Sequence, residues 1–304
     1  MIKKVGIVGF GALGILFGSY LSDKMGKENF FVIADEERVK RYKEKGIYKN
    51  GVLCDMNYVS PGENSHKVDL MLFGVKYSAM GEALKLAEGF VHSKTIFVSL
   101  LNGIASEEDI AEKFGSENVV YSTAQCMDSL KVDNAITYRD MGFLNFGRVG
   151  SIGSDENIAA LKEFFDRTAF PYKMPEDMSK NLWGKLLLNT GCNQAAAVFD
   201  CCFDVLQKEG RPREVMIGAM REVMEVGQAE GINLDEGDVE YWVKVLDGLN
   251  PKGMPSLRQD VLNRRKTEVE LFSGTINRLG KKHNIKTPYN EFLYAEIKKI
   301  EENY

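Results

Sequence analysis

The sequence predicts an α/β fold, in which a doubly wound parallel sheet is followed by an all-helical C-terminal domain. Up to about residue 170, short apolar runs alternate with amphipathic segments, and a glycine-rich loop follows the first run. After Pro175 only long helical patterns remain. A chain of 304 residues suits two domains, which we expect at 1–172 and 173–304, with Pro171 and Pro175 marking the boundary.

The expected strands are continuous apolar runs rich in β-branched residues, which is typical of parallel strands buried on both faces. They are Val5–Phe10, Phe30–Ala34, Leu70–Val75, Thr95–Leu100 and Val119–Ser122. The stretches between them predict helices at Ala12–Lys24, Glu36–Lys45, Ser78–Phe90 and Ser106–Phe114. Ile136–Gly153, with scattered glycine and aromatic residues, predicts an antiparallel extension of the sheet. In the second half, long helices are expected at Asn181–Phe199, Pro212–Gln228, Ser256–Lys282 and Tyr289–Ile300.

Composition excludes several classes of protein. The net charge of −5, without a cluster of Lys or Arg, gives no electrostatic case for nucleic-acid binding. No apolar run reaches the roughly 18 to 20 residues of a membrane span. The apolar stretch after Lys3-Lys4 is interrupted by glycines, so we interpret it as the first strand and helix rather than a signal peptide. We therefore expect a cytoplasmic protein that associates with neither nucleic acid nor membrane.

The five cysteines form no spaced pair of the kind that binds zinc, and their odd number argues against a disulfide framework. We therefore expect no metal site. The adjacent Cys201 and Cys202 are compatible with a redox pair or with two small buried thiols. The sequence leaves their role open.

The loop after the first strand reads Gly9-Phe10-Gly11-Ala12-Leu13-Gly14 and opens a helix. In a Rossmann-type domain the first such glycine makes the tight turn, the second lets the backbone approach a pyrophosphate, and the third allows close helix–strand packing. The helix N-terminus supplies amide donors for the phosphates. The loop therefore predicts a dinucleotide cofactor, the alternatives being a purely structural glycine turn or a methyltransferase-like nucleotide loop.

Asp35 lies at the end of the second strand, about 20 residues beyond the glycine loop. A carboxylate there accepts hydrogen bonds from the ribose hydroxyls and repels a 2′-phosphate, which favours NAD over NADP. The neighbouring Arg38, Lys40 and Arg41 could reverse that preference. Asp35 also precedes a helix, so a capping role is equally compatible with its position.

Lys185, Asn189 and Asn193 are spaced four residues apart and share one face of a predicted helix. The other positions of this helix are mostly apolar, so much of its surface is expected to be buried, and buried polar groups must be paired or face a cavity. A cation beside two amides suits an anionic substrate that carries a hydroxyl group. The alternative is a solvated stripe on a surface helix.

Glu268 is predicted to share a helix stripe with the apolar side chains of Leu271, Phe272 and Leu279. A carboxylate in such a setting is often functional, although Thr267-Glu268 is also compatible with a helix cap and first turn. Ser256 precedes Gln259 by three positions, which is a capping-box pattern. Ser256 is therefore a candidate for either a cap or a binding role.

The ordered set of motifs resembles the ketopantoate reductase family from residue 5 to beyond residue 280. The shared motifs are Gly9 to Gly14, Val75-Lys76, Asn102-Gly103, Lys185 to Asn193, Pro255-Ser256 and Thr267-Glu268. The resemblance implies reduction of a small branched 2-keto acid by NADPH or NADH, most directly 2-dehydropantoate to pantoate. It also implies a site in the cleft between the two domains.

By position, the resemblance implies that Lys185 is the general acid and that Glu268 orients the substrate hydroxyl or Lys185 itself. Asn189 and Asn193 would bind the substrate hydroxyl, and Ser256 the carboxylate. The same resemblance places Lys76 and Asn102 beside the nicotinamide and its ribose. A lysine ammonium can both stabilise the developing alkoxide and donate a proton, so the chemistry is coherent.

Three features depart from the family pattern: acidic Asp35 where a basic residue is usual, Gln194-Ala195-Ala196 after Asn193, and Arg258 beside Ser256. They leave open a related dehydrogenase of another 2-keto or 3-hydroxy acid. A dinucleotide-binding sensor without catalysis is the third hypothesis, although a sensor would not need a proton donor. The apolar helical half is compatible with a homodimer.

Overall fold

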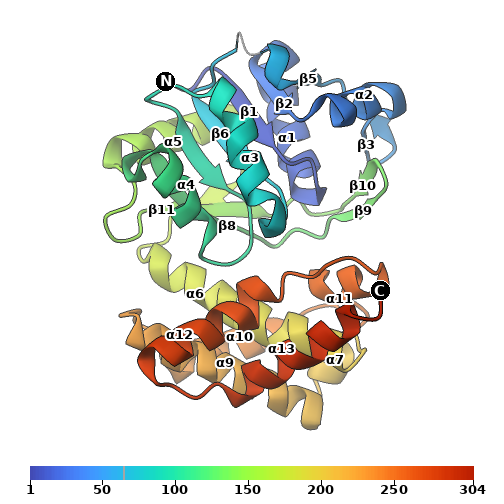
Figure 1. Ribbon diagram of the computed structural model, residues 1–304, viewed down its shortest axis with the longest axis vertical. Coiled ribbons are helices and arrows are strands. Elements are labelled where there is room, and N and C mark those ends of the chain that lie inside the picture. Colours follow the sequence, from blue (N-terminus) through green and yellow to red (C-terminus); the bar gives the residue numbers. More distant parts are fainter. Residues whose placement is uncertain (64–65) are drawn as a thin grey trace. The chain divides into compact units, whose positions relative to one another are not determined.

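An eight-stranded sheet organises the N-terminal half of the computed structural model, which describes residues 1–63 and 66–304 (Figure 1). Its order is β12-β11-β8-β7-β6-β1-β2-β5, and β1 pairs in parallel with β2 on one side and β6 on the other. This confirms the doubly wound topology, because the chain starts in the middle and winds outward both ways. The strands are β1 (Val5–Val8), β2 (Phe30–Ile33), β5 (Asn57–Val59), β6 (Leu70–Phe73), β7 (Ile96–Ser99), β8 (Val119–Gln125), β11 (Phe143–Gly147) and β12 (Tyr172–Lys173).

Helices cover both faces of this sheet, as its fully buried parallel strands require. On one face, α1 (Ala12–Met25) and α5 (Asp155–Thr168) pack into an apolar cluster that contains Phe17 and Phe165. On the other face, α3 (Met80–Ala87) and α4 (Ser106–Phe114) pack into a cluster around Phe73 and Phe97. The fifth helix, α2 (Glu36–Lys45), follows β2. Short 3₁₀ turns occupy Lys27–Asn29, Pro61–Glu63, Tyr77–Ala79, Glu88–Phe90 and Ser116–Asn118.

The predicted antiparallel extension is only partly correct. Strand β11 does pair antiparallel with β8 and extends the main sheet. Ile136, however, belongs to β10 (Ala135–Thr137), which lies in a separate sheet of order β4-β3-β10-β9. The other strands of this sheet are β3 (Tyr48–Lys49), β4 (Val52–Leu53) and β9 (Leu130–Val132), so its register depends on segments some 80 residues apart, which no local pattern shows.

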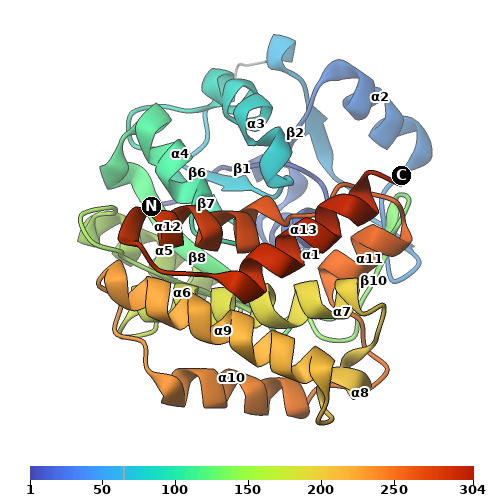
Figure 2. The same ribbon diagram turned by 60° about the horizontal axis from the view of Figure 1, so that its bottom comes forward.

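The C-terminal half is helical, as expected (Figure 2). Two of its turns are π-helical: η6 (Asn189–Asn193) lies between α6 (Met178–Leu188) and α7 (Gln194–Val198), and η7 (Glu270–Gly274) precedes α12 (Thr275–His283). The remaining helices are α8 (Phe203–Leu206), α9 (Arg211–Ala229), α10 (Glu236–Asp247), α11 (Ser256–Leu262) and α13 (Pro288–Glu301).

The single helix predicted over Ser256–Lys282 is wrong. Helix α11 ends at Leu262, and Arg264 takes a left-handed φ of +48°. The amide of Arg265 then donates to the carbonyl of Asp260, five residues earlier, and a hydrogen bond of this kind is typical of a helix C-terminus. Glycine and asparagine are the residues that usually adopt this conformation, so the arginine at position 264 did not predict the end of the helix. Helix α10 was not predicted; it begins with a reciprocal capping box between Asp235 and Asp238.

The chain divides into two compact units. The sheet unit comprises Met1–Leu101 and Ala105–Met178, and the helical unit comprises Asn102–Ile104 and Ser179–Tyr304. The short loop Asn102–Ile104 therefore packs with helices that follow it by many residues. Within residues 1–63 and 66–304, no helix has the length and apolarity to cross a membrane.

Candidate active site

The glycine loop of the sheet unit contains two glycines that the fold requires and one that it does not. Gly9 has a φ of +96°, and a Cβ there would lie 2.5 Å from the backbone of Gly74 and Val75. A Cβ on Gly14 would lie 2.2 Å from the Gly9 carbonyl oxygen. At Gly11 the nearest atom to a Cβ would be the Gly74 oxygen at 3.5 Å, an ordinary contact. The protein's own packing thus requires Gly9 and Gly14 but not Gly11, which matches the glycine that makes room for a pyrophosphate.

The first turn of α1 also lacks the acidic side chains that several other helices have in their first turns. Gly11 caps it without a side chain, and its first turn contains no acidic residue. The helices α2, α4, α5 and α10 each carry two or more acidic residues in the first turn. The amides and positive end of α1 are therefore left for an anion, and the half-buried Gly11, Ala12 and Leu13 are accessible to one.

Asp35 lies two residues after β2 and is the N-cap of α2. One carboxylate oxygen accepts from the Arg38 amide at 2.7 Å, and the other lies 3.2 Å from Arg38 Nη1. The capping role that the sequence allowed is thus real. The side chains of Asp35 and Arg38 are 45% and 47% exposed, so both remain available to a ribose or its phosphate.

Lys76 and Asn102 follow the adjacent strands β6 and β7, whose carboxyl ends share the edge of the glycine loop. Lys76 is exposed and lies just before a 3₁₀ turn. Asn102 is half-buried and packs with the helical unit, where its Nδ2 donates to Glu268 Oε2 at 3.3 Å. The neighbouring Gly103 has a φ of +92° and lies against Leu271, which holds the loop there.

The polar stripe Lys185–Asn189–Asn193 runs from α6 into the π turn η6. Asn189 and Asn193 are 9% and 8% exposed, and Asn193 Nδ2 donates to Asn189 Oδ1 at 3.2 Å. Lys185 is half-buried one turn earlier. The two amides therefore share a face, and the burial of the stripe argues against a solvated surface helix.

Glu268 precedes the second π turn, η7, and is half-buried. It does not lie in a continuous helix with Leu279, as the stripe predicted, because the helical run to Leu279 begins with η7 at Glu270 and continues as α12. Thr267 holds the local backbone: its amide and hydroxyl both donate to Glu301 at 2.7 Å, and its hydroxyl accepts from the Val269 amide. The N-cap of η7 is Val269 and no side chain caps this turn, so the cap and first turn that the sequence allowed at Thr267-Glu268 are absent, and Glu268 carries a carboxylate held by the Asn102 amide.

Ser256 opens α11 but does not cap it. The N-cap is Pro255, and no side chain bonds the free amides there. Gln259 instead donates to the Met254 carbonyl, so the capping box predicted for this pair is absent. Ser256 is exposed, and within residues 1–63 and 66–304 its hydroxyl makes no hydrogen bond that would indicate a structural role.

Arg258 and the cysteine pair form a cluster whose partners the sequence did not reveal. The Arg258 side chain is 12% exposed, donates to Asp200 at 3.0 Å, and lies 3.5 Å from Cys202 Sγ. All five cysteines are free. Burial raises the pKa of Cys201 to about 11, which disfavours the thiolate that redox chemistry needs.

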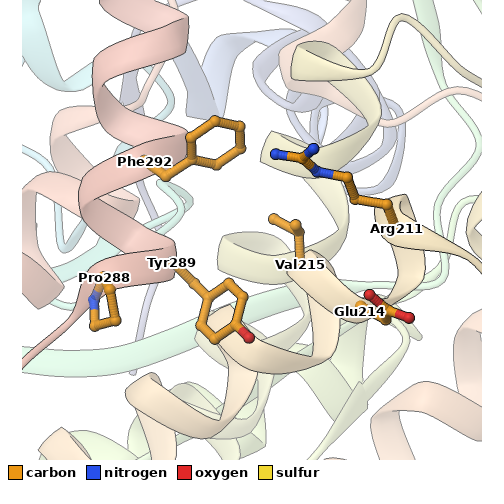
Figure 3. A pocket seen from close by; sticks show the side chains of 6 residues that line it. All are labelled: Arg211, Glu214, Val215, Pro288, Tyr289 and Phe292. Carbon is orange, nitrogen blue, oxygen red and sulfur yellow. The ribbon is translucent and has the colours of Figure 1, made fainter.

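A hollow of about 380 Å³ lies at the N-terminal ends of α9 and α13 (Figure 3). It is lined by Arg211, Glu214, Val215, Pro288, Tyr289 and Phe292. None of the residues predicted for the site lines it, so it has no part in that assignment.

Comparison with known proteins identifies the family of the chain. The profile of Ketopantoate reductase PanE/ApbA matches residues 5–151, and that of its C-terminal part matches residues 177–301. A 2-dehydropantoate 2-reductase of Streptococcus pyogenes (serotype M6) is 25% identical over 289 residues, which cover 93% of each chain.

Solved structures share the fold over 99% of both chains. A D-mandelate dehydrogenase with NADH and anilino(oxo)acetate has a TM-score of 0.88 at 24% identity. A dimeric ketopantoate reductase from Staphylococcus aureus has a TM-score of 0.79 at 19% identity. Both profiles thus match in order, one on each unit, and the chain belongs to the ketopantoate reductase family of NAD(P)-dependent oxidoreductases.

Proposed function

We propose that this protein reduces 2-dehydropantoate to pantoate. The observation that carries the proposal is the buried amide pair Asn189–Asn193, which follows Lys185 on an otherwise apolar helix. Buried amides of this kind bind a substrate that offers hydroxyl and carbonyl groups, and an ammonium group beside them suits a keto oxygen. The name of the Streptococcus pyogenes relative supports this substrate.

The cofactor is proposed to bind at Gly9–Gly14, with its pyrophosphate in the space left by Gly11 at the uncompensated end of α1. A nicotinamide bound there supplies the hydride. Lys76 and Asn102 are proposed to border the nicotinamide and its ribose, because they follow the neighbouring strands at the same edge. Asp35 favours NADH, but Arg38 neutralises part of its charge, so we expect NADH to serve at least comparably to NADPH.

Lys185 is proposed to donate a proton from Nζ to the keto oxygen as negative charge develops on it. Glu268 is proposed to orient the substrate hydroxyl or Lys185 itself. Its carboxylate is in turn held by the Asn102 amide, which limits its rotation. Asn189 and Asn193 would bind the substrate hydroxyl, and the exposed Ser256 hydroxyl its carboxylate.

We further propose a homodimer in the cytoplasm. The dimeric Staphylococcus aureus structure of the same fold supports the first part. The second is supported by the five free thiols, which suit a reducing compartment.

A second candidate is the reduction of another 2-keto acid. Arg258 favours it, because this guanidinium lies two residues from Ser256 and its buried Nε has no hydrogen-bond partner among the described residues. The fold shared with a D-mandelate dehydrogenase makes an aryl 2-keto acid the natural competitor to test.

The substrate is tested by following NADH and NADPH oxidation with 2-dehydropantoate, unbranched 2-keto acids and phenylglyoxylate. We expect the highest kcat/KM with 2-dehydropantoate. A higher value with phenylglyoxylate would favour the second candidate. Cofactor binding without turnover of any member of the panel would refute both.

The proton donor is tested with Lys185→Ala, which should lower kcat by about 10²- to 10⁴-fold. Cofactor titration should be nearly unchanged, because the glycine loop belongs to the other unit. Lys185→Arg should restore little activity, since guanidinium is a poor proton donor with different geometry. The matched control is Lys180→Ala on the same helix, which removes an ion pair to Asp238 and should leave kcat unchanged. A Lys185→Ala enzyme within tenfold of the wild-type kcat would contradict the assignment.

A further inference from the structure

Two π turns, η6 and η7, contact each other in the helical unit, and each adjoins residues proposed for the substrate site. Asn189 and Asn193 begin and end η6, and Glu268 lies two residues before η7. A π turn is rare, is less favourable than the α-helix that surrounds it, and occurs often at functional sites. The backbone groups that it displaces from the regular bonding pattern need other partners.

The side chain of Gln194 provides such partners to both turns. Its Nε2 donates to the Thr190 carbonyl in η6 at 2.6 Å. Its Oε1 accepts from the Ser273 amide in η7 at 3.4 Å. In η7 the next amide, that of Gly274, reaches back five residues to the Val269 carbonyl, which is the π pattern. One fully buried side chain therefore joins η6, which directly precedes it, to η7, where Ser273 lies 79 residues further along the chain.

This connection continues into the core of the unit. The Ser273 hydroxyl donates to Asn290 Oδ1 at 2.8 Å, and Asn290 Nδ2 donates to Glu222 Oε2 at 2.7 Å. Glu222 also accepts the amides of Tyr289 and Asn290 at the start of α13. Gln194, Ser273 and Asn290 are all 0% exposed. A buried polar network with its donors and acceptors satisfied rigidifies the elements it joins.

We propose that Gln194 is a positioning residue, whose side chain clamps η6 to η7 and so fixes Asn189 and Asn193 relative to Glu268. The role rests on the proposed function, because it assigns these three residues to the substrate site. Gln194 touches the π turns and not the reacting atoms. It is also one of the positions where the sequence departs from the family pattern.

The expected effect on catalysis follows from geometry. Displacing a positioned group by about 1 Å can lower a rate by about 10²-fold even when the altered residue lies outside the chemistry. Gln194→Met keeps the length of the side chain and removes both hydrogen bonds. We expect it to lower kcat about 10- to 100-fold, to change KM for the keto acid less than kcat, and to leave the cofactor Kd unchanged.

A second readout does not depend on turnover. Hydrogen–deuterium exchange should accelerate in Gln194→Met in both segments that the clamp joins, residues 188–198 and 267–276, compared with wild type. Gln194→Glu provides a rescue, because a protonated carboxyl can still donate to the Thr190 carbonyl and accept from the Ser273 amide. Its activity relative to wild type should therefore rise as the pH falls. Glu222, at the far end of the network, is present in both wild type and Gln194→Glu, so the readout is the ratio of the two activities at each pH.

The matched control is Gln207→Met. Gln207 also donates from Nε2 to main-chain carbonyls, those of Leu246 and Leu249, but at the end of α10. It should lose comparable bonds and keep the wild-type kcat. The proposal is overturned if Gln194→Met stays within threefold of the wild-type kcat, if Gln207→Met loses as much activity, or if only one of the two segments exchanges faster. If wild type reduces no 2-keto acid, the proposed function fails, and the exchange measurement alone decides whether the clamp exists.

Discussion

Glu107 should make the sheet unit less stable at pH 8 than at pH 5, and replacing it with glutamine should remove this dependence. Its carboxyl lies in the first turn of α4 and is 1% exposed. Burial raises its pKa to about 7, against the hydrogen bond from Ser106 Oγ at 2.8 Å. Glu108 raises the pKa further by its charge.

The sign follows from comparing the folded and unfolded states. Well below pH 4.5 the carboxyl is protonated in both states and contributes nothing to the pH dependence. As the pH rises from 4.5 to 7, the unfolded state loses its proton and the folded state keeps it, so stability falls. Shifting the pKa from 4.5 to about 7 corresponds to a loss of roughly 3 kcal/mol at pH 8 and roughly 1 kcal/mol at pH 5. The Glu107→Gln variant mimics the protonated form. Its free energy of unfolding, relative to that of wild type, should therefore be roughly 2 kcal/mol higher at pH 8 than at pH 5.

Hydrogen exchange of the β7 and β8 amides at each pH, converted to opening free energies with the intrinsic rates, measures this difference in the sheet unit. Fluorescence would not, because Trp183 and Trp242 both lie in the helical unit. The control is Glu108→Gln, the exposed neighbour in the same turn, which retains Glu107 and should keep the pH dependence of wild type, so that its stability difference from wild type changes little between pH 5 and pH 8. If the stability difference between Glu107→Gln and wild type is the same at pH 5 and pH 8, the reasoning is refuted.

Two further predictions concern the cofactor. Gly11→Ala should keep the wild-type Tm, because its Cβ meets nothing closer than 3.5 Å, but its affinity for NADH should fall at least tenfold. The control Gly14→Ala should instead lose stability. A Gly11→Ala protein with normal NADH affinity would show that the pyrophosphate does not bind at this loop. Asp35→Asn should raise the ratio of kcat/KM with NADPH to kcat/KM with NADH, and Arg38→Ala should lower this ratio. Steady-state kinetics with both cofactors measures it. If wild type prefers NADPH by more than roughly a hundredfold, Arg38 or its neighbours override the effect of the Asp35 carboxylate.

Local sequence patterns were sufficient for the parallel sheet, for the helical character of the second half and for part of the candidate site. Continuous apolar runs predicted the parallel strands, because strands covered on both faces need no polar alternation. The spacing of Gly9, Gly11 and Gly14 predicted the loop, because only glycine allows the φ of Gly9 and the contact of Gly14 with the Gly9 carbonyl. The four-residue spacing of Asn189 and Asn193 predicted their shared face, and their side chains are indeed hydrogen-bonded.

Features that depend on distant partners were not predictable from such patterns. The break after α11 rests on the left-handed Arg264, and the grouping of Asn102 with the helical unit rests on Glu268, 166 residues away. The π turns are the clearest case, because each one displaces backbone groups that require a partner elsewhere. For η7 that partner is Gln194, which the sequence marked only as a departure from the family.

The sequence alone thus identified the candidate site residues, because residue type and short-range spacing depend only on the local chain. Tertiary structure decided which of them meet and how firmly they are held. Burial made the amides of Asn189 and Asn193 an internal pair, turned Gln194 into a clamp and raised the pKa of Glu107. Burial and long-range hydrogen bonds arise only when segments far apart in the chain pack together, and no local pattern records which segments those will be.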